Sequence, residues 1–125
     1  MHHSKKPIDF LNFTNLEEIV MPYSKRFVNL FNHPKLKTIM LENFNQLNFI
    51  FTENNVLETL SIEKSKACDW SSLTNFNNLK SLYLTGISTL NDISWMPQLS
   101  NLIDIELSNC KKIEKRYCIL KIVVI

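Results

Sequence analysis

The chain has 125 residues, 45% of them hydrophobic, and its 14 Lys and Arg against 12 Asp and Glu give a formal net charge of +2. This length suits one domain with a continuous core, and so small a net charge gives no support to wholesale nucleic-acid binding. The chain contains one glycine, Gly86. A P-loop, a dinucleotide-binding turn and a nucleophile elbow each need several glycines and are therefore excluded.

The N-terminal residues indicate a cap rather than a targeting segment. Met1 to Phe13 contains no apolar stretch that resembles a secretion signal. The chain also has no run of about 18 apolar residues that could span a membrane. We therefore expect a cytoplasmic protein, with a secreted effector as the alternative. Residues 1–15 are expected to form a partial N-terminal cap, in which Ile8, Phe10 and Leu11 cover the first unit of the array.

Five similar units follow, and each opens with a Leu that precedes aliphatic residues three and five positions later. Successive opening leucines are 20, 21, 22 and 23 residues apart. The repeats start at Leu16, Leu36, Leu57, Leu79 and Leu102. Apolar and variable residues alternate over about five positions, which is typical of a short strand with one buried face. The pattern predicts strands over residues 18–22, 38–42, 59–63, 81–85 and 104–108.

The segments between these strands must return the chain by one full coil. Successive strands are therefore expected to be parallel and adjacent. Apolar residues recur eleven and fourteen positions after the opening Leu and should fill the convex side of the core. They are Phe27, Leu47, Leu90 and Ile113 in the first set, and Leu30, Ile50 and Ile93 in the second. Units this short predict irregular or 3₁₀ turns in these segments rather than long α-helices.

Residues 117–125 are largely apolar and predict a terminal sixth strand with no polar cap after it. An uncovered, hydrophobic strand edge invites pairing with another chain. Two interpretations follow and both stay open. The array either continues in a longer molecule or closes its edge by self-association.

The approach to the opening Leu is itself repeated, as Phe13-Thr-Asn-Leu16, Phe76-Asn-Asn-Leu79 and Leu99-Ser-Asn-Leu102. From residue 13 to about 116 the chain resembles the leucine-rich repeat family, whose period is roughly 20–29 residues. The resemblance implies the fold class α/β, as a right-handed parallel β solenoid with short strands on the concave side and loops or 3₁₀ turns on the convex side. Residues 1–125 would form a single domain of this kind.

Two further features concern the repeat subtype and leave it open. The stretch from Leu73 to Cys110 is similar to the short bacterial repeats of internalins. The ninth position departs from the usual ladder of Asn, so the backbone hydrogen bonds of such a ladder must be found elsewhere. It holds Ser24, Phe44, Ser65, Ile87 and Cys110. Cys110 equally suits cysteine-containing or plant-resistance-like repeats.

Residues that could carry catalysis or bind a metal are few and scattered. His33 is the one His inside the array, and because it precedes Pro34 we expect a solvated loop residue. Three cysteines without CxxC spacing indicate neither a disulfide framework nor a zinc site. Cys68 and Cys110 are expected to point into the core. We predict a protein that is not an enzyme, with no catalytic residue, no metal site and no cofactor. Trp70 and Trp95 should cover the convex core.

The outward residues of the predicted strands form a concave grid, called here the open face. It comprises Glu18, Val20, Pro22, Thr38, Met40, Glu42, Thr59, Ser61, Glu63, Ser81, Tyr83, Thr85, Asp104, Glu106 and Ser108. It holds five of the 12 acidic residues of the chain and no Lys, Arg or His. The candidate partner-binding residues are Glu18, Met40, Glu42, Glu63, Tyr83, Asp104 and Glu106. The acids would steer a basic partner, and Met40 and Tyr83 would supply apolar anchors.

A simpler interpretation is that these residues are solvated positions screened by Lys37, Lys64 or Lys80. If the face is functional, the chain is a non-enzymatic module that binds a protein or peptide with a basic surface, and no small-molecule substrate. Alternatively, it is the recognition or scaffold segment of a larger receptor, effector or ubiquitin-ligase adaptor. A weaker alternative is nucleic-acid binding through a basic rim at Lys111, Lys112, Lys115 and Arg116.

Overall fold

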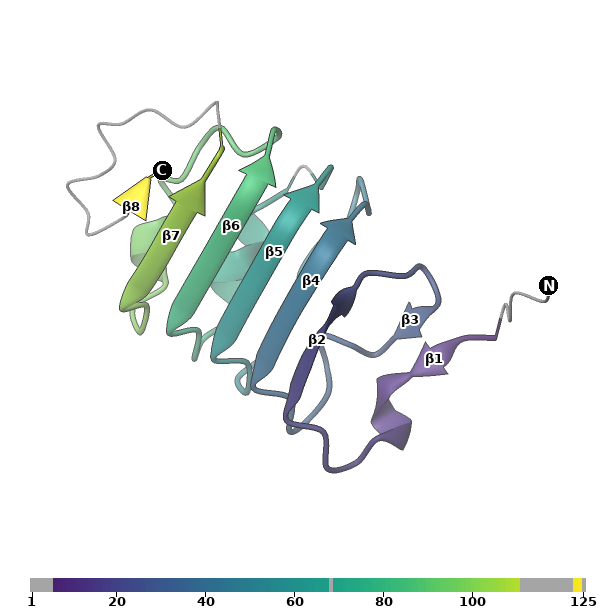
Figure 1. Ribbon diagram of the computed structural model, residues 1–125. Coiled ribbons are helices and arrows are strands. Elements are labelled where there is room, and N and C mark those ends of the chain that lie inside the picture. Colours follow the sequence, from purple (N-terminus) through teal and green to yellow (C-terminus); the bar gives the residue numbers. More distant parts are fainter. Residues whose placement is uncertain (1–5, 68, 111–122, 125) are drawn as a thin grey trace.

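The computed structural model describes residues 6–67, 69–110 and 123–124, which form a mostly-β, solenoid-like arrangement (Figure 1). Its main sheet has the order β2-β4-β5-β6-β7-β8, and every pair of neighbours is parallel. A second sheet pairs β1 with β3. The strands are β1 (Ile8–Asp9), β2 (Glu18–Pro22), β3 (Phe27–Val28), β4 (Thr38–Phe44), β5 (Thr59–Ser65), β6 (Ser81–Ile87), β7 (Asp104–Ser108) and β8 (Val123–Val124).

The five predicted repeat strands are confirmed. β2 and β7 have the predicted bounds, and β4, β5 and β6 each run two residues further. They run further because the chain turns inward again at the end of each, where Phe44, Ser65 and Ile87 are buried. Of the terminal strand predicted over residues 117–125, only Val123 and Val124 lie among the described residues, and they pair in parallel with β7.

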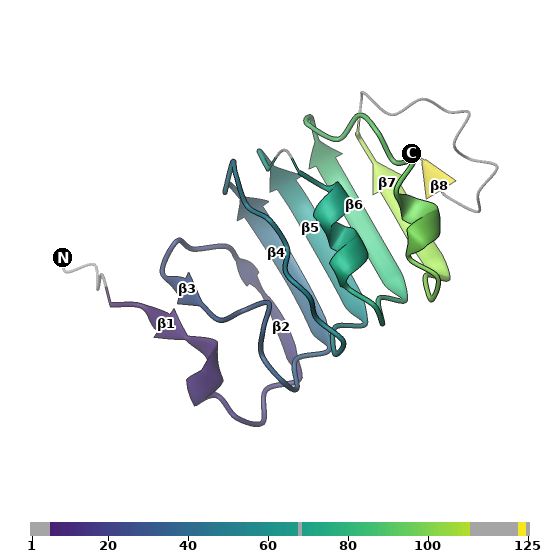
Figure 2. The ribbon, with the colours of Figure 1, turned by 180° about the vertical axis from the view of Figure 1, so that it is seen from behind.

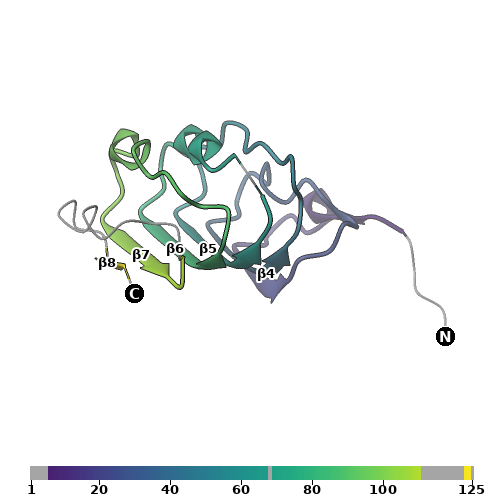
Figure 3. The ribbon, with the colours of Figure 1, turned by 90° about the horizontal axis from the view of Figure 1, so that it is seen from above.

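The helical part of the predicted α/β class is wrong for the described part of the chain. Those residues hold no α-helix, only the short 3₁₀ turns η1 (Phe10–Asn12), η2 (Ser71–Asn75) and η3 (Met96–Gln98). Seen from behind, η2 and η3 lie across the back of the sheet (Figure 2). Seen from above, the strands form one layer and the return segments a second (Figure 3). The expectation of 3₁₀ turns rather than long helices is confirmed there.

The core is built from the inward-facing side chains of the strands and from side chains of the return segments. Ile39, Leu60 and Leu82 share one position on neighbouring strands and are fully buried. Trp70 and Trp95 are buried on the side of the return segments, as predicted. Their indole N–H groups donate to the Thr89 hydroxyl and to the carbonyl of Asp92. Both tryptophans therefore bury their apolar surface without leaving the N–H unpaired.

The second return segment corrects two predictions. Leu47 and Ile50 were expected in the core but are 55% and 61% exposed. Phe51 is fully buried instead, and Phe49 packs against the core. A large aromatic ring fills the space between coils better than the neighbouring Ile, so the inward register of this segment follows Phe49 and Phe51.

His33 also differs from its prediction, because it is 2% exposed rather than solvated. Its Nε2 lies 2.8 Å from the carbonyl oxygen of Phe13 in the preceding coil, and its Nδ1 accepts from the backbone N–H of Lys35 at 3.0 Å. A carbonyl accepts and an N–H donates, so these partners select the neutral Nε2–H tautomer. Asn54 lies at the same repeat position, three residues before the opening Leu, and makes equivalent bonds.

The hydrogen bonds that an Asn ladder would supply at the ninth position are partly replaced there. The Ser65 hydroxyl donates to the carbonyl of Phe44 at 2.6 Å and accepts from the N–H of Ala67 at 3.0 Å. Cys110 is buried as predicted, and its Sγ lies 3.5 Å from the carbonyl oxygen of Leu84. Cys68 and Cys118 lie outside the described residues. Further coil-to-coil bonds come from Asn75 and Asn101, whose side chains donate to backbone carbonyls of the previous coil.

The N-terminal residues cover the first coil in part, as expected. Phe10 is buried and its ring meets that of Phe27 edge to face at 5.0 Å. Ile8 is half-buried, whereas Leu11 is exposed. The Asp9 carboxylate accepts from the Asn29 amide and from the N–H of Leu11, which lowers the pKa of Asp9. Asp9 thus links η1 to the turn that follows β3.

Turns at the carboxyl ends of the strands share an unusual backbone. Four residues at one repeat position, seven after the opening Leu, have positive φ angles between 55° and 66°. They are Asn43, Lys64, Gly86 and Asn109. Gly and Asn adopt this left-handed conformation readily, but for Lys it costs roughly 1–2 kcal/mol.

Replacing Lys64 with Gly is therefore expected to raise the free energy of unfolding by about 0.5–1 kcal/mol, after the flexibility of Gly in the unfolded chain is counted. Gly86→Ala is expected to lower it by about 1 kcal/mol. A Cβ at Gly86 would meet Lys64 Cγ only at an ordinary 3.6 Å, so this cost is conformational. Urea denaturation measures the free energy of unfolding of both variants. Equal effects of the two substitutions would contradict a left-handed backbone at both positions.

Candidate functional site

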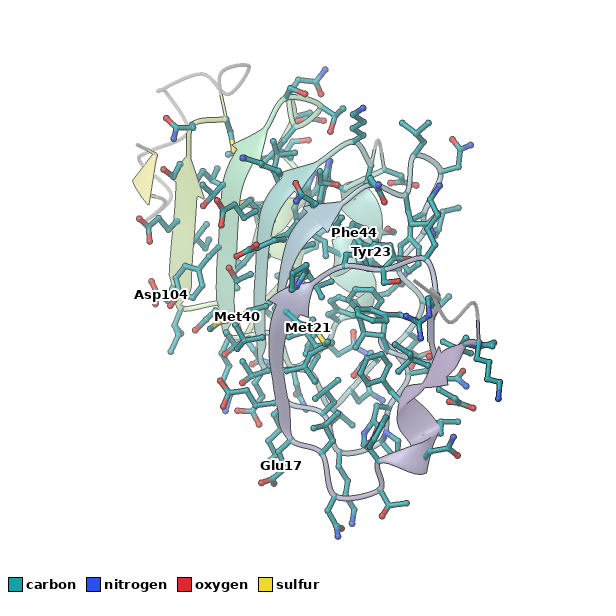
Figure 4. The ribbon with its side chains drawn as sticks, turned by 45° about the vertical axis from the view of Figure 1, so that its right-hand side comes forward. Glu17, Met21, Tyr23, Met40, Phe44 and Asp104 are labelled. Atoms are coloured by element: carbon teal, nitrogen blue, oxygen red, sulfur yellow. The ribbon has the colours of Figure 1, made fainter. Side chains whose placement is uncertain are left out.

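The open face is formed as the sequence predicted. Every one of its fifteen side chains is exposed or half-exposed, and the residues between them on each strand are buried or half-buried. In Figure 4, Met40 and Asp104 lie on one side of the sheet, whereas Phe44 and Tyr23 lie on the other. The strand register orders the open face into three rows. They are Glu18-Thr38-Thr59-Ser81-Asp104, Val20-Met40-Ser61-Tyr83-Glu106 and Pro22-Glu42-Glu63-Thr85-Ser108.

The acids of the open face stand close together. Glu42 and Glu63 are direct partners on β4 and β5 and both are exposed. Neighbouring strands are about 4.8 Å apart, and like charges in such a pair are unfavourable by roughly 0.2–1 kcal/mol. Asp104 and Glu106 project from the same face of β7. The fold therefore holds one pair of acids on β4 and β5 and a second pair on β7, and Glu18 stands apart from both on β2.

The lysines that could screen these acids lie at the edges of the sheet. A ladder of alternating charge runs where the strands begin, through Glu17, Lys37, Glu58 and Lys80, and it ends at Ile103. Backbone N–H groups join each member to the carbonyl of the one before it, at 2.8–2.9 Å. Lys80 Nζ lies 3.4 Å from Glu58 Oε1 within this ladder. Lys37 and Lys80 therefore lie beside acids of the ladder rather than over the open face.

Sequence reasoning missed this ladder because it considered only the inward and outward residues of the strands. Its signal was present, since Glu, Lys, Glu and Lys immediately follow four successive opening leucines. Ile103 takes the fifth place and is 80% exposed. The ladder is thus charged along most of its length and apolar at one end.

Two apolar residues adjoin at the β2 end of the middle row. Val20 is 65% exposed and pairs with Met40, which is half-exposed. Ser61 follows on β5 and Tyr83 on β6. A small side chain, Ser61, therefore separates two larger ones, Met40 and Tyr83, in this row. Val20 was part of the predicted grid but was not among the candidate partner-binding residues.

Tyr83 is held toward β7 by a hydrogen bond. Its hydroxyl donates to Oδ2 of Asp104 on that neighbouring strand. The carboxylate acceptor favours the protonated phenol, and this raises the pKa of Tyr83. Two candidate partner-binding residues are therefore joined directly, and the Tyr83 ring is positioned across the boundary between β6 and β7.

Asp104→Asn is expected to lower the pKa of Tyr83 toward its ordinary value, because the neutral amide no longer opposes formation of the phenolate. The raised pKa of Tyr83 also makes the stability of the fold depend on pH. The hydrogen bond stabilises the fold below the ordinary pKa of Tyr, and this contribution is lost as the pH rises through the raised value. An NMR titration of isotope-labelled tyrosine rings measures the change, and an unaltered Tyr83 curve in the variant would show that Asp104 is not its partner.

Other candidate chemistry finds little support among the described residues. No group of three or more His, Cys, Asp or Glu there could hold a metal ion. No helix in the same part of the chain is long and apolar enough to span a membrane. The predicted basic rim from Lys111 to Arg116 lies outside the described residues.

Comparison of the chain with models of protein families, with curated proteins and with solved structures found no match in any of the three. The assignment of a function therefore depends on the geometry of the open face and on the chemistry of its side chains.

Proposed function

We propose that this chain is a leucine-rich repeat module, with a right-handed coil, that binds a protein or peptide through the open face. The regular spacing of L-x-x-L-x-L units and the parallel sheet in sequence order support the family assignment. Repeats of this kind stack into extended surfaces that suit recognition of macromolecules. The module is proposed to act without catalysis.

The observation that carries this proposal is the charge of the open face. Five acids project from one side of the sheet, and no Lys, Arg or His shares any of its fifteen positions. A surface of one sign raises the encounter rate of oppositely charged partners and excludes like-charged ones. The favoured partner is therefore a protein or peptide segment rich in Lys or Arg.

The apolar residues of the open face would add contact area to this charge. Val20 and Met40 form one apolar contact point, and the Tyr83 ring forms another, already positioned by Asp104. A positioned ring loses little conformational freedom on binding, which favours affinity. We expect the partner to place apolar groups or the aliphatic stems of its basic side chains against these two points.

Capture of partners from a lysate of the source organism tests the proposal. The wild-type chain is compared with a double variant of the open face, Glu42→Lys with Glu63→Lys. A matched double variant, Glu17→Lys with Glu53→Lys, makes the same change of net charge away from that face. A specific partner should be retained by the wild type and the matched variant but lost by the open-face variant. Equal retention by all three proteins would overturn the proposal.

A further inference from the structure

A hollow surrounded by basic and polar groups lies at the carboxyl ends of the strands, apart from the open face. Its volume is about 560 Å³. It is lined by Asn43, Asn45, Lys64, Ser65, Lys66, Gly86 and Ser88. No Asp or Glu is among these residues. The lining offers the ammonium group of Lys64 together with amide and hydroxyl donors, which is the chemistry that recognises an oxyanion.

The left-handed turns hold this lining in place. Asn43, Lys64 and Gly86 are the positive-φ residues of three consecutive coils, so their turns stack beside one another. The Lys64 stem extends across the Gly86 turn, because its Cγ lies 3.6 Å from the place that a Cβ atom would take on Gly86. Lys64 thus lines the hollow although its left-handed backbone is unfavourable for a Lys.

The electrostatic surroundings favour an anion. Among the described residues, Lys64 makes no ion pair within 4.0 Å. Glu42 and Glu63 directly precede two residues of the lining in the sequence, but both belong to the open face and do not line the hollow. An ammonium group that is not neutralised by a protein carboxylate remains available to an anionic ligand.

A second hollow adjoins the first and has a different character. Its volume is about 440 Å³, and Asn45 lines both hollows. It is lined also by Leu47, Phe49 and Ile50, together with Lys25 and Gln46. Leu47 and Ile50 are the apolar residues that the core leaves exposed. An apolar surface therefore lies beside a basic and polar one.

From this juxtaposition we propose that the two hollows together bind a phosphate monoester that carries an apolar group. The phosphate would occupy the hollow at Lys64, and the apolar group would cover Leu47 and Ile50. Phosphate suits the lining because its oxygens can accept from ammonium, amide and hydroxyl donors at once. The sequence analysis predicted no small-molecule substrate and did not find this site, whose two sets of residues are brought together only by the stacked turns.

NMR titration with phenyl phosphate, inorganic phosphate and benzoate tests this site. Phenyl phosphate is expected to shift the amide signals of residues 43–50, 64–66 and 86–88 in a saturable way. Inorganic phosphate should shift the signals at the first hollow alone and bind more weakly. Benzoate should bind more weakly than phenyl phosphate, because a carboxylate carries fewer acceptor oxygens. Equal affinity for benzoate and phenyl phosphate, or shifts spread evenly over all the lysines, would overturn the proposal.

Matched variants separate the two hollows. Lys64→Asn keeps a residue that tolerates the left-handed turn and is expected to weaken phenyl phosphate binding about tenfold, as expected for the loss of one charge-assisted hydrogen bond. Lys37→Asn, at the opposite end of the strands, should leave the affinity unchanged. Leu47→Ser with Ile50→Ser should remove the preference for phenyl phosphate over inorganic phosphate without weakening the latter. Equal effects of Lys64→Asn and Lys37→Asn would contradict the assigned site.

Discussion

Phe51→Ala is expected to lower the free energy of unfolding by about 3–5 kcal/mol. The Phe51 ring is fully buried at the centre of an aromatic cluster that joins three coils. Its centroid lies 4.9 Å from that of Phe49, 5.2 Å from that of Phe31 and 5.3 Å from that of Phe76. The substitution removes the hydrophobic burial of the ring and leaves a cavity between rigid neighbours. Because a domain of this size is stable by only about 5–15 kcal/mol, the loss should be obvious in urea denaturation.

The adjacent residue supplies the matched control for this prediction. Ile50 is 61% exposed, so Ile50→Ala should change the free energy of unfolding by no more than about 0.5 kcal/mol. The two variants together test the inward register of the second return segment. A larger loss for Ile50→Ala than for Phe51→Ala would restore the register predicted from the sequence and contradict the structure.

Asn54→Ala is expected to lower the free energy of unfolding by about 2–3 kcal/mol. The Asn54 side chain is buried and uses both ends of its amide. Nδ2 donates to the carbonyl of Phe31 in the preceding coil at 2.5 Å, and Oδ1 accepts from the N–H groups of Val56 and Leu57 at 2.7 and 2.9 Å. Alanine would leave these backbone groups without the partner, and unpaired buried polar groups are costly.

Two further variants show whether the effect comes from these bonds. Asn54→His places at this position the side chain that serves the same role at His33, so it should recover part of the lost stability. Asn45→Ala removes an exposed Asn and should change stability by about 0.5 kcal/mol or less. If Asn54→Ala were no more destabilising than Asn45→Ala, the hydrogen bonds of the Asn54 side chain would not contribute to stability.

Prediction from the sequence succeeded where one periodicity decides the structure. The alternation of apolar and variable residues placed Leu60 and Ile62 inward and Ser61 and Glu63 outward, as the structure has them. A shift of one residue would expose the whole apolar set, so this register is strongly determined. For the same reason, all fifteen positions of the open face could be predicted before any contact was known.

Prediction of the buried residues failed in the second return segment, where they were placed at fixed distances from the opening Leu. Irregular turns have no fixed period, and the size of Phe49 and Phe51 decides which side chains are buried in the second segment. His33 was misplaced because a His before Pro in a loop was expected to be solvated. A usable signal existed, since His33 and Asn54 share one repeat position and both side chains can donate and accept at once.

The left-handed turns could be predicted only in part. Asn adopts a left-handed backbone readily, so the abundance of Asn in the sequence favours such turns, but it does not say where they lie. Their shared position emerges when Asn43, Gly86 and Asn109 are aligned, and Lys64 then stands out as the exception. The link between Tyr83 and Asp104 likewise requires the register of β6 and β7 together with a side-chain direction that periodicity does not supply.

A map of the partner's footprint on the chain tests whether binding occurs through the open face. With a captured partner bound, NMR signals of isotope-labelled chain should shift and broaden on the open face, at Met40, Glu42, Glu63 and Tyr83, and should stay unchanged in η2 and η3. Raising the salt concentration should weaken this complex, because opposite charges at exposed sites are screened. A footprint on the return segments that leaves the signals of the open face unchanged would contradict binding through the open face.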